Sequence, residues 1–354
     1  MTIRVVCLLA VLASAFAQVA TAQMKTEAPP VVAGAKPVSV ESIKIHSRAI
    51  EGNLEGNAVE RDMLVFLPPS YRKEASRRYP VVYALHGYFV GAEQWSHEIH
   101  APQTIEGAFA SGAKEMIVVL PDSKTVHNGS MYSGSMTTGD FETFIARDVV
   151  SYIDEHYRTI PERRSRGLAG HSMGGYGATR IGMKHADEFG SLYVMSPCCL
   201  APRSVGPPNA EMTKQLEEVQ SPADSAKLPF FARAQLAAAA AWSPNPKNPP
   251  LFLDLPTGEA QADVLARWAA NAPLAFIHQY IGNIRRYDAI AIDVGDRDGL
   301  RTDTAKLHDV LDSYGIEHTF QVYAGDHTNK LGDRFQNHVL PFFGANLCFK
   351  AGCR

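Results

Sequence analysis

The sequence has only a small net charge and few cysteines. Its 354 residues carry 34 lysines and arginines against 37 aspartates and glutamates, a formal net charge of −3 at pH 7. No run of five like charges occurs, so the basic footprint of a nucleic-acid-binding protein is missing. None of its five cysteines lies with histidines at a zinc-site spacing, and no internal repeat is visible. We therefore expect no nucleic-acid partner, no metal and no organic cofactor.

A membrane-spanning hydrophobic run is missing as well, and the one apolar stretch near the start is short. Residues 5–16 are apolar, follow Arg4 and precede the small residues Ala20 and Ala22. A positive start, a short apolar core and small residues at −3 and −1 are typical of a secretory signal peptide. We expect residues 1–22 to be this peptide, cleaved after Ala22. The run is too short for a stable membrane span, so the mature chain is expected to be secreted or periplasmic.

Composition shifts along the rest of the chain indicate one large domain. Residues 23–38 are rich in alanine, proline and valine without periodicity, which predicts a linker. Residues 39–345 alternate strand-like and helix-like patterns. The segment at about 201–285 interrupts that alternation with alanine-rich and proline-rich stretches, and we expect it to be an insertion over the sheet edge. Residues 346–354 form a C-terminal tail.

Continuous apolar runs stopped by turn residues indicate strands buried on both faces of a parallel sheet. Strands are expected at 40–45, 63–67, 81–85, 116–120, 167–169, 192–195, 287–294 and 320–323. Helical periodicity lies between several of them, with Asp140 as the N-cap of one helix. We predict an α/β fold with a mainly parallel central sheet and helices on both faces. The first two strands resemble a hairpin, which would make the leading edge mixed.

The stretch GHSMGGYG, from Gly170 to Gly177, lies where a predicted strand turns into a predicted helix. Gly170-x-Ser172-x-Gly174 matches the nucleophile-elbow pattern, in which a serine holds a strained backbone and its neighbours two residues away must lack bulk. An ordinary glycine-rich loop would fit the five residues alone. The strand before and the helix after favour Ser172 as a nucleophile.

A serine hydroxyl needs an adjacent base, and this arrangement places an acid and then a histidine after later strands. His327 follows the last strand and is the predicted base. Asp296 and Asp298 lie in the turn after the preceding strand, whereas Asp293 lies within that strand and would be a buried structural group. We favour Asp298 as the acid, with Asp296 as second choice.

Two backbone donors are needed to stabilise the oxyanion of a tetrahedral intermediate. One is expected from Met173, the residue after the serine. The other is expected from the loop after an early strand, where we choose the N–H of Tyr88. His86 precedes the serine in the chain and is expected to be structural.

The four cysteines that remain after export could pair in more than one way. Cys348 and Cys353 are close in sequence, and an oxidising compartment would favour a disulfide between them. Cys198 and Cys199 could form a vicinal disulfide, remain as two thiols, or pair with the C-terminal cysteines.

Five segments within about residues 50–330 carry a resemblance to a known family: NLEGNAVERDMLVFLPPSY, RYPVVYALHGYFVGAEQW, GLAGHSMGGYGA, DVGDRDGL and YAGDH. Together they resemble the esterase D branch of the α/β-hydrolases. That branch includes S-formylglutathione hydrolases, enterochelin- and feruloyl-esterase-like proteins and secreted mycolyltransferases.

The resemblance implies an α/β-hydrolase fold with a catalytic triad of Ser172, His327 and Asp298. The acid of this branch usually lies in a Gly-x-x-Asp turn, which the segment ending at Asp298 matches. Tyr88 and Met173 are implied as the oxyanion donors, and Trp95 as a packing residue. The signal peptide departs from the cytosolic formylglutathione enzymes, so a glutathione thioester is a poor candidate substrate.

These observations predict a secreted serine hydrolase that cleaves small-molecule carboxylic esters through an acyl-enzyme, without a cofactor. The alternatives are an acyltransferase with the same triad and a sugar or polyol acceptor, or a non-catalytic binding protein on the same fold. The expected pocket walls are the 88–95 loop, the stretch 131–138 and the 201–285 insertion. The stretch 131–138 is expected to be either a mobile loop or a plain surface turn.

Expression of the whole chain in a bacterial host tests the signal peptide. We expect the exported protein to begin at Gln23, because Ala20 and Ala22 supply the small residues that signal peptidase requires. Intact mass and N-terminal sequencing of the exported fraction measure this. An exported chain that still carries Arg4 would contradict the assignment.

Overall fold

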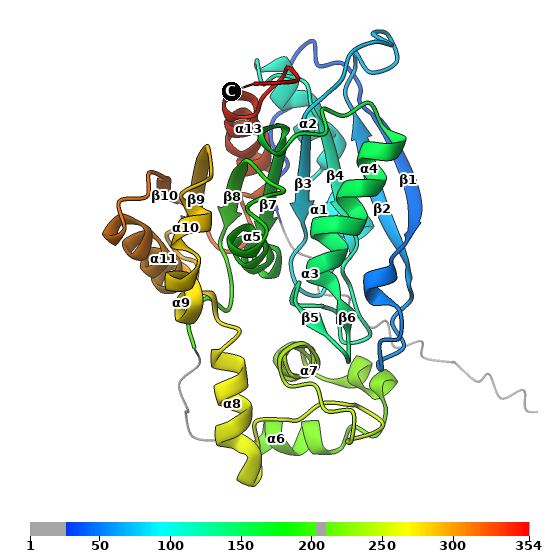
Figure 1. Cartoon of the computed structure of the whole chain (residues 1–354), viewed down its shortest axis with the longest axis vertical. Helices are drawn as coiled ribbons and strands as arrows, with labels where there is room; N and C mark the ends of the chain where they lie inside the picture. The colour runs from blue at the N-terminus through cyan, green and yellow to red at the C-terminus, as the bar shows by residue number, and fades with distance from the viewer. Residues whose placement is uncertain (1–25, 203–209, 354) are drawn as a thin grey trace, which may run out of the picture.

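An eight-stranded sheet runs through the centre of the molecule, in the order β1-β2-β4-β3-β7-β8-β9-β10 (Figure 1). The computed structural model describes residues 26–202 and 210–353, so the expected signal peptide lies outside the described residues. The strands are β1 (Ser39–His46), β2 (Glu60–Leu67), β3 (Val81–Leu85), β4 (Ile117–Pro121), β7 (Arg166–His171), β8 (Ser191–Met195), β9 (Ala289–Gly295) and β10 (Thr319–Tyr323).

The sheet is mainly parallel. β1 pairs with β2 and β2 with β4 in antiparallel register, and every later pair from β4 to β10 is parallel. All residues of β3, β4, β7 and β8 are buried, as expected for strands covered on both faces. The predicted parallel sheet with a mixed leading edge is confirmed.

Helices cover both faces of the sheet, as predicted, and bury two separate hydrophobic clusters. One face carries α1 (Ala92–Glu98), α2 (Ala101–Ala110), α12 (Leu331–Arg334) and α13 (Leu340–Asn346). The other carries α3 (Phe141–Thr143), α4 (Val150–His156), α5 (Met173–Lys184) and α11 (Arg301–Ser313). Asp140 caps α3 by accepting the Thr143 N–H at 3.0 Å, as predicted. No helix in the described ranges is long and apolar enough to cross a membrane.

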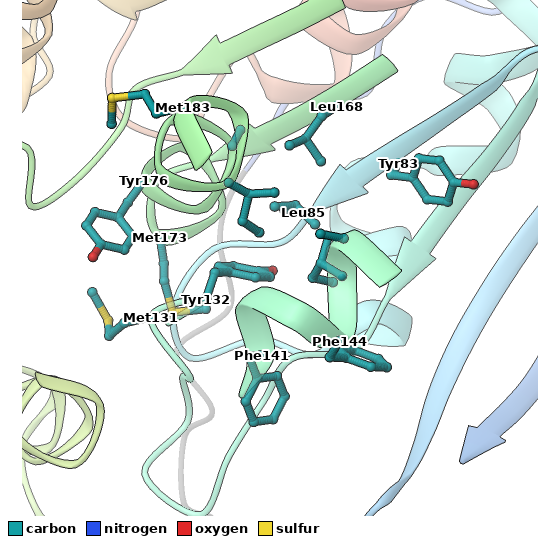
Figure 2. Close-up of a cluster of buried hydrophobic side chains, with 14 of the residues drawn as sticks. Tyr83, Leu85, Met131, Tyr132, Phe141, Phe144, Leu168, Met173, Tyr176 and Met183 are labelled. Carbon is teal, nitrogen blue, oxygen red and sulfur yellow. The ribbon is translucent and has the colours of Figure 1, made fainter. Parts of the chain in front are cut away.

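The cluster beneath α5 ties the sheet to the stretch 131–138 (Figure 2). Tyr132 lies against α5 so closely that a Cβ on Gly177 would come within 2.6 Å of its ring. Met131, Tyr132 and Ser133 are buried, and only Gly134 and Met136 in this stretch are exposed. The short strands β5 (Gly134–Ser135) and β6 (Gly139–Asp140) pair within it. The expected surface turn was wrong, because the stretch packs into the core.

Between β8 and β9, where the alternation was expected to break, the described residues form five α-helices. They are α6 (Ala210–Glu217), α7 (Phe230–Trp242), α8 (Gln261–Ala269), α9 (Pro273–Phe276) and α10 (Ile281–Ile284). The first three lie at one end of the sheet, below β5 and β6 in Figure 1. α9 and α10 pack against α5.

The terminal segments are anchored to the domain. The Glu27 N–H donates to the Asn329 carbonyl at 2.8 Å, and the Val38 N–H donates to the Glu106 carboxylate at 3.0 Å. At the other end, Cys348 and Cys353 form the disulfide that was expected. Cys198 and Cys199 are two thiols, with their Sγ atoms 2.9 Å apart.

A buried ion pair between Asp293 and Arg334 joins β9 to α12. Asp293 is 1% exposed, and its Oδ2 accepts hydrogen bonds from the Tyr193 hydroxyl at 2.8 Å and from the Arg334 Nε at 2.8 Å. Burial raises the pKa of Asp293, while the Arg334 charge and these hydrogen bonds favour its ionised form. Asp293 is thus a structural group, as expected.

Replacing Asp293 with alanine should destabilise the fold by about 3–5 kcal/mol, because Arg334 would keep a buried charge without an opposite charge beside it. Urea denaturation followed by tryptophan fluorescence measures the change. Asp303→Ala is the matched control, since Asp303 pairs with Lys306 on the surface, where such pairs contribute less than about 1 kcal/mol. Equal losses in both variants would contradict the structural role of Asp293.

Candidate active site

Ser172 occupies the sharp turn between β7 and α5. Its φ of 57° and ψ of −114° are strained for a residue with a side chain. Two backbone hydrogen bonds to the end of β8 and the residues after it hold this turn. The Ser172 N–H donates to the Met195 carbonyl at 3.1 Å, and the Cys198 N–H donates to the Ser172 carbonyl at 3.1 Å. The turn has the conformation expected of a nucleophile elbow.

The glycines on either side of Ser172 are required by close backbone approach. A Cβ on Gly170 would overlap the carbonyl of Gly174, and a Cβ on Gly174 would overlap the carbonyl of Leu85 at the end of β3. Only glycine fits at both positions. The sequence prediction that the neighbours of Ser172 must lack bulk therefore has a direct steric basis.

The structure brings Ser172, His327 and Asp298 into one hydrogen-bonded line. The Ser172 hydroxyl lies 3.0 Å from His327 Nε2, and His327 Nδ1 lies 2.8 Å from Asp298 Oδ2. Asp298 follows β9 and His327 follows β10, so both side chains come from the same end of the parallel strands as Ser172. Open parallel sheets place their sites at this end.

The environment of Asp298 suits an ionised acid. Its side chain is 1% exposed, whereas that of His327 is 36% exposed. Burial works to raise the pKa of Asp298, but hydrogen bonds from His327 and the Leu300 N–H outweigh it and lower the pKa below its usual value. Asp298 therefore stays ionised beside the imidazole.

Asp296, the second choice for the acid, does not contact His327. Asp296 is 43% exposed and accepts a hydrogen bond from the Gly325 N–H at 2.9 Å. It fastens the loop that carries His327 without contacting the ring.

The two segments that carry the expected oxyanion donors both reach Ser172. A Cβ on Gly87, the residue before Tyr88, would come within 3.5 Å of the Ser172 Cβ. Met173 is the first residue of α5, and the first N–H groups of a helix have no partner within it. His86, expected to be structural, is buried and accepts the Ser123 N–H at 2.8 Å.

Sequence reasoning missed the role of His171. Its Nε2 donates to the backbone carbonyl of His327 at 2.8 Å, and the two rings lie 4.6 Å apart. Burial lowers the pKa of His171 to about 3, so it is neutral at ordinary pH. This hydrogen bond holds the backbone of the His327 loop against the end of β7. No pattern signalled this contact, because its partner is a carbonyl 156 residues away.

The three segments expected to form pocket walls contact one another. The Tyr88 ring packs edge-on against Phe230 at 5.2 Å, and Ser135 Oγ donates to the Ala240 carbonyl at 2.5 Å. Phe89 also packs against Phe230, at 5.6 Å. The aromatic residues of α7 were not predicted, because their partners lie about 140 residues earlier in the chain.

The family of the chain follows from a match over most of its length. Residues 57–339 match the family model described as "Putative esterase". The chain belongs to this esterase family. The resemblance to esterases inferred from the sequence is confirmed.

Curated relatives match part of this esterase-family chain. The endo-1,4-beta-xylanase/feruloyl esterase of Xylanibacter ruminicola is 28% identical over 150 residues, 41% of this chain and 21% of that protein. An esterase of Mycobacterium tuberculosis is 30% identical over 131 residues, 36% of this chain and 27% of that protein. The match thus spans about a quarter of the length of these relatives.

Solved structures share the fold over nearly their whole length. A ferulic acid esterase aligns with a TM-score of 0.61 and 24% identity, covering 87% of this chain and 98% of that chain. An S-formylglutathione hydrolase from Staphylococcus aureus aligns with a TM-score of 0.57 and 15% identity, covering 86% and 97%. At these identities the likeness shows the α/β-hydrolase fold, which confirms the predicted fold class.

Gly174→Ala should destabilise the chain by about 3 kcal/mol or more, because the new methyl group would overlap a backbone carbonyl that cannot move without disturbing β3. Thermal unfolding by circular dichroism measures the loss. Gly282→Ala in α10 is the matched control: a Cβ there meets nothing within 4 Å, so the change should be neutral or stabilise by up to about 1 kcal/mol. A Gly174→Ala variant as stable as Gly282→Ala would refute the steric argument.

Proposed function

We propose that the chain is an exported serine hydrolase of carboxylic esters that works through an acyl-enzyme on Ser172. The observation that carries this proposal is the continuous hydrogen-bonded line from Ser172 through His327 to Asp298. Membership of an esterase family agrees with it. No metal or organic cofactor is part of the proposed reaction.

In the first half of the reaction, Ser172 Oγ attacks the acyl carbonyl carbon. His327 Nε2, 3.0 Å away, takes the hydroxyl proton. The imidazolium that forms is stabilised by the ionised Asp298, which also holds the ring with its Nδ1 proton toward the carboxylate. The former carbonyl oxygen becomes an oxyanion and accepts hydrogen bonds from the N–H groups of Tyr88 and Met173.

Collapse of that intermediate breaks the ester C–O bond. His327 Nε2 returns its proton to the leaving alcohol, and the acyl group remains on Ser172. A water then takes the place of the alcohol, gives a proton to His327 and attacks the acyl carbon. The carboxylic acid leaves, and Ser172 regains its proton.

The aromatic residues beside Tyr88 support an ester with an aromatic or extended apolar acyl group. Phe230 and Phe231 are 44% and 76% exposed at the start of α7, and their rings lie 5.3 Å apart. Together with Tyr88 and Phe89 they form an apolar face next to the proposed oxyanion donors. The ferulic acid esterase named among the structural neighbours acts on an ester of this chemical class.

Ser172→Ala and His327→Ala should each lower kcat by on the order of 10⁴- to 10⁶-fold, because the nucleophile and its base act as one unit. Initial rates with p-nitrophenyl acetate and with an aryl ester such as methyl ferulate measure the loss. Ser172→Ala with wild-type turnover would sink the proposal. Product analysis with added glycerol separates the alternatives: a glycerol ester as the main product would replace hydrolysis with acyl transfer.

The matched variants Asp298→Asn and Asp296→Asn test which aspartate of this turn is the acid. Asp298→Asn should lower kcat by on the order of 10³- to 10⁴-fold, since the amide would favour the wrong imidazole tautomer. Asp296→Asn should leave kcat near the wild-type value, because its carboxylate contacts only the loop backbone and Arg297. The reverse order of effects would transfer the role to Asp296.

A further inference from the structure

Three potential metal ligands gather on the α11–β10 unit, away from Ser172. His308 and Asp312 lie one turn apart on α11, and His318 lies just before β10. One ligand atom from each of the three side chains lies within 4.8 Å of the other two. The proposed reaction uses none of them.

The two imidazole rings face each other through nitrogens that suit a metal ion. His308 Nδ1 lies 2.8 Å from His318 Nε2. His318 Nδ1 donates to the Ile316 carbonyl at 2.8 Å, which fixes its proton on Nδ1 and leaves a lone pair on Nε2. A hydrogen bond from the second ring nitrogen to a backbone carbonyl is the usual way a metal-binding histidine is oriented.

The rings are held in place, while the carboxylate is accessible. The His318 side chain is 1% exposed, and the His308 ring stacks on Phe320 with centroids 4.5 Å apart and an angle of 19° between the planes. The Asp312 side chain is 63% exposed, with one oxygen 3.6 Å from His308 Nε2 and the other 4.0 Å from His318 Nδ1. An ion would therefore enter from the solvent side and meet two rings that are already positioned.

We propose that His308, Asp312 and His318 form a binding site for a divalent zinc ion, with water as the fourth ligand. Zinc favours imidazole and carboxylate ligands in tetrahedral geometry, with ligand atoms about 3.4 Å apart. His308 Nδ1 and His318 Nε2 lie 2.8 Å apart and would separate to about this distance around the ion. The Asp312 oxygens lie 3.6 and 4.0 Å from the other nitrogen of each ring, so the exposed carboxylate would turn to reach the ion. His308 Nδ1 and His318 Nε2 bind the ion. The proton on His308 Nδ1 moves to Nε2, so the ring stays neutral, and the Asp312 carboxylate offsets one positive charge.

A bound ion would join the last turns of α11 to the start of β10. Asp298 precedes α11 and His327 follows β10, so the opposite end of the same unit carries the proposed acid and base. A zinc ion here would stabilise this unit at the edge of the sheet without contacting the ester. The inference does not depend on the proposed function.

Calorimetric titration of zinc chloride into the untagged protein tests the site. We expect one equivalent to bind to the wild type, and thermal unfolding to shift upward with zinc and back with EDTA. Asp312→Asn, an exposed change, should weaken binding at least about tenfold, and His308→Gln should abolish it. Circular dichroism in EDTA establishes that both variants are folded.

His156→Gln is the matched control, because the exposed ring of His156 stacks on Tyr152 as the half-buried ring of His308 stacks on Phe320. It should bind zinc as the wild type does. The absorption spectrum of the cobalt complex separates binding at the proposed site from binding at Cys198 and Cys199. Thiolate ligands give a sulfur-to-metal charge-transfer band, which the proposed site lacks. No binding by the wild type, equal binding by His308→Gln, or a thiolate band would each overturn the proposal.

Discussion

The strained backbone of Ser172 is the constraint on which the rest of the site depends. A φ of 57° on a residue with a side chain persists only when its surroundings fix it. Here β3, β7 and β8 are buried throughout, and the carbonyls of Met195 and Leu85 come up against the turn. The glycines at 170 and 174 allow this approach. The buried sheet therefore maintains a serine hydroxyl that points out at the end of its strands.

Three aspartates that lie close together in the sequence have different roles because their surroundings differ. Asp293 is buried against Arg334 and holds β9 to a helix. Asp296 is half exposed and fastens the loop before His327. Asp298 is buried but meets the His327 ring, which keeps it ionised. Only the last position combines burial with an imidazole partner, and this combination is what the proposed mechanism needs.

The His327 loop is held from several sides. Asp298 bonds to its ring, His171 bonds to its backbone carbonyl, and Asp296 bonds to the preceding turn. The α11–β10 unit connects the two residues that follow β9 and β10, so its rigidity bears directly on their spacing. We propose that the apolar face to which α7 contributes selects the acyl group.

The sequence by itself determined the parallel sheet, because continuous apolar runs such as Val81–Leu85 can be satisfied only by burial on both faces. It also determined the elbow at Ser172 and favoured Asp298 and His327, because both follow strands whose ends must meet. Only the tertiary structure decided that Met131 and Tyr132 are buried, that His171 holds the His327 loop, and that Phe230 packs on Tyr88. Local patterns encode which face of a segment is apolar. Which distant segment covers that face is decided only when the whole core is packed.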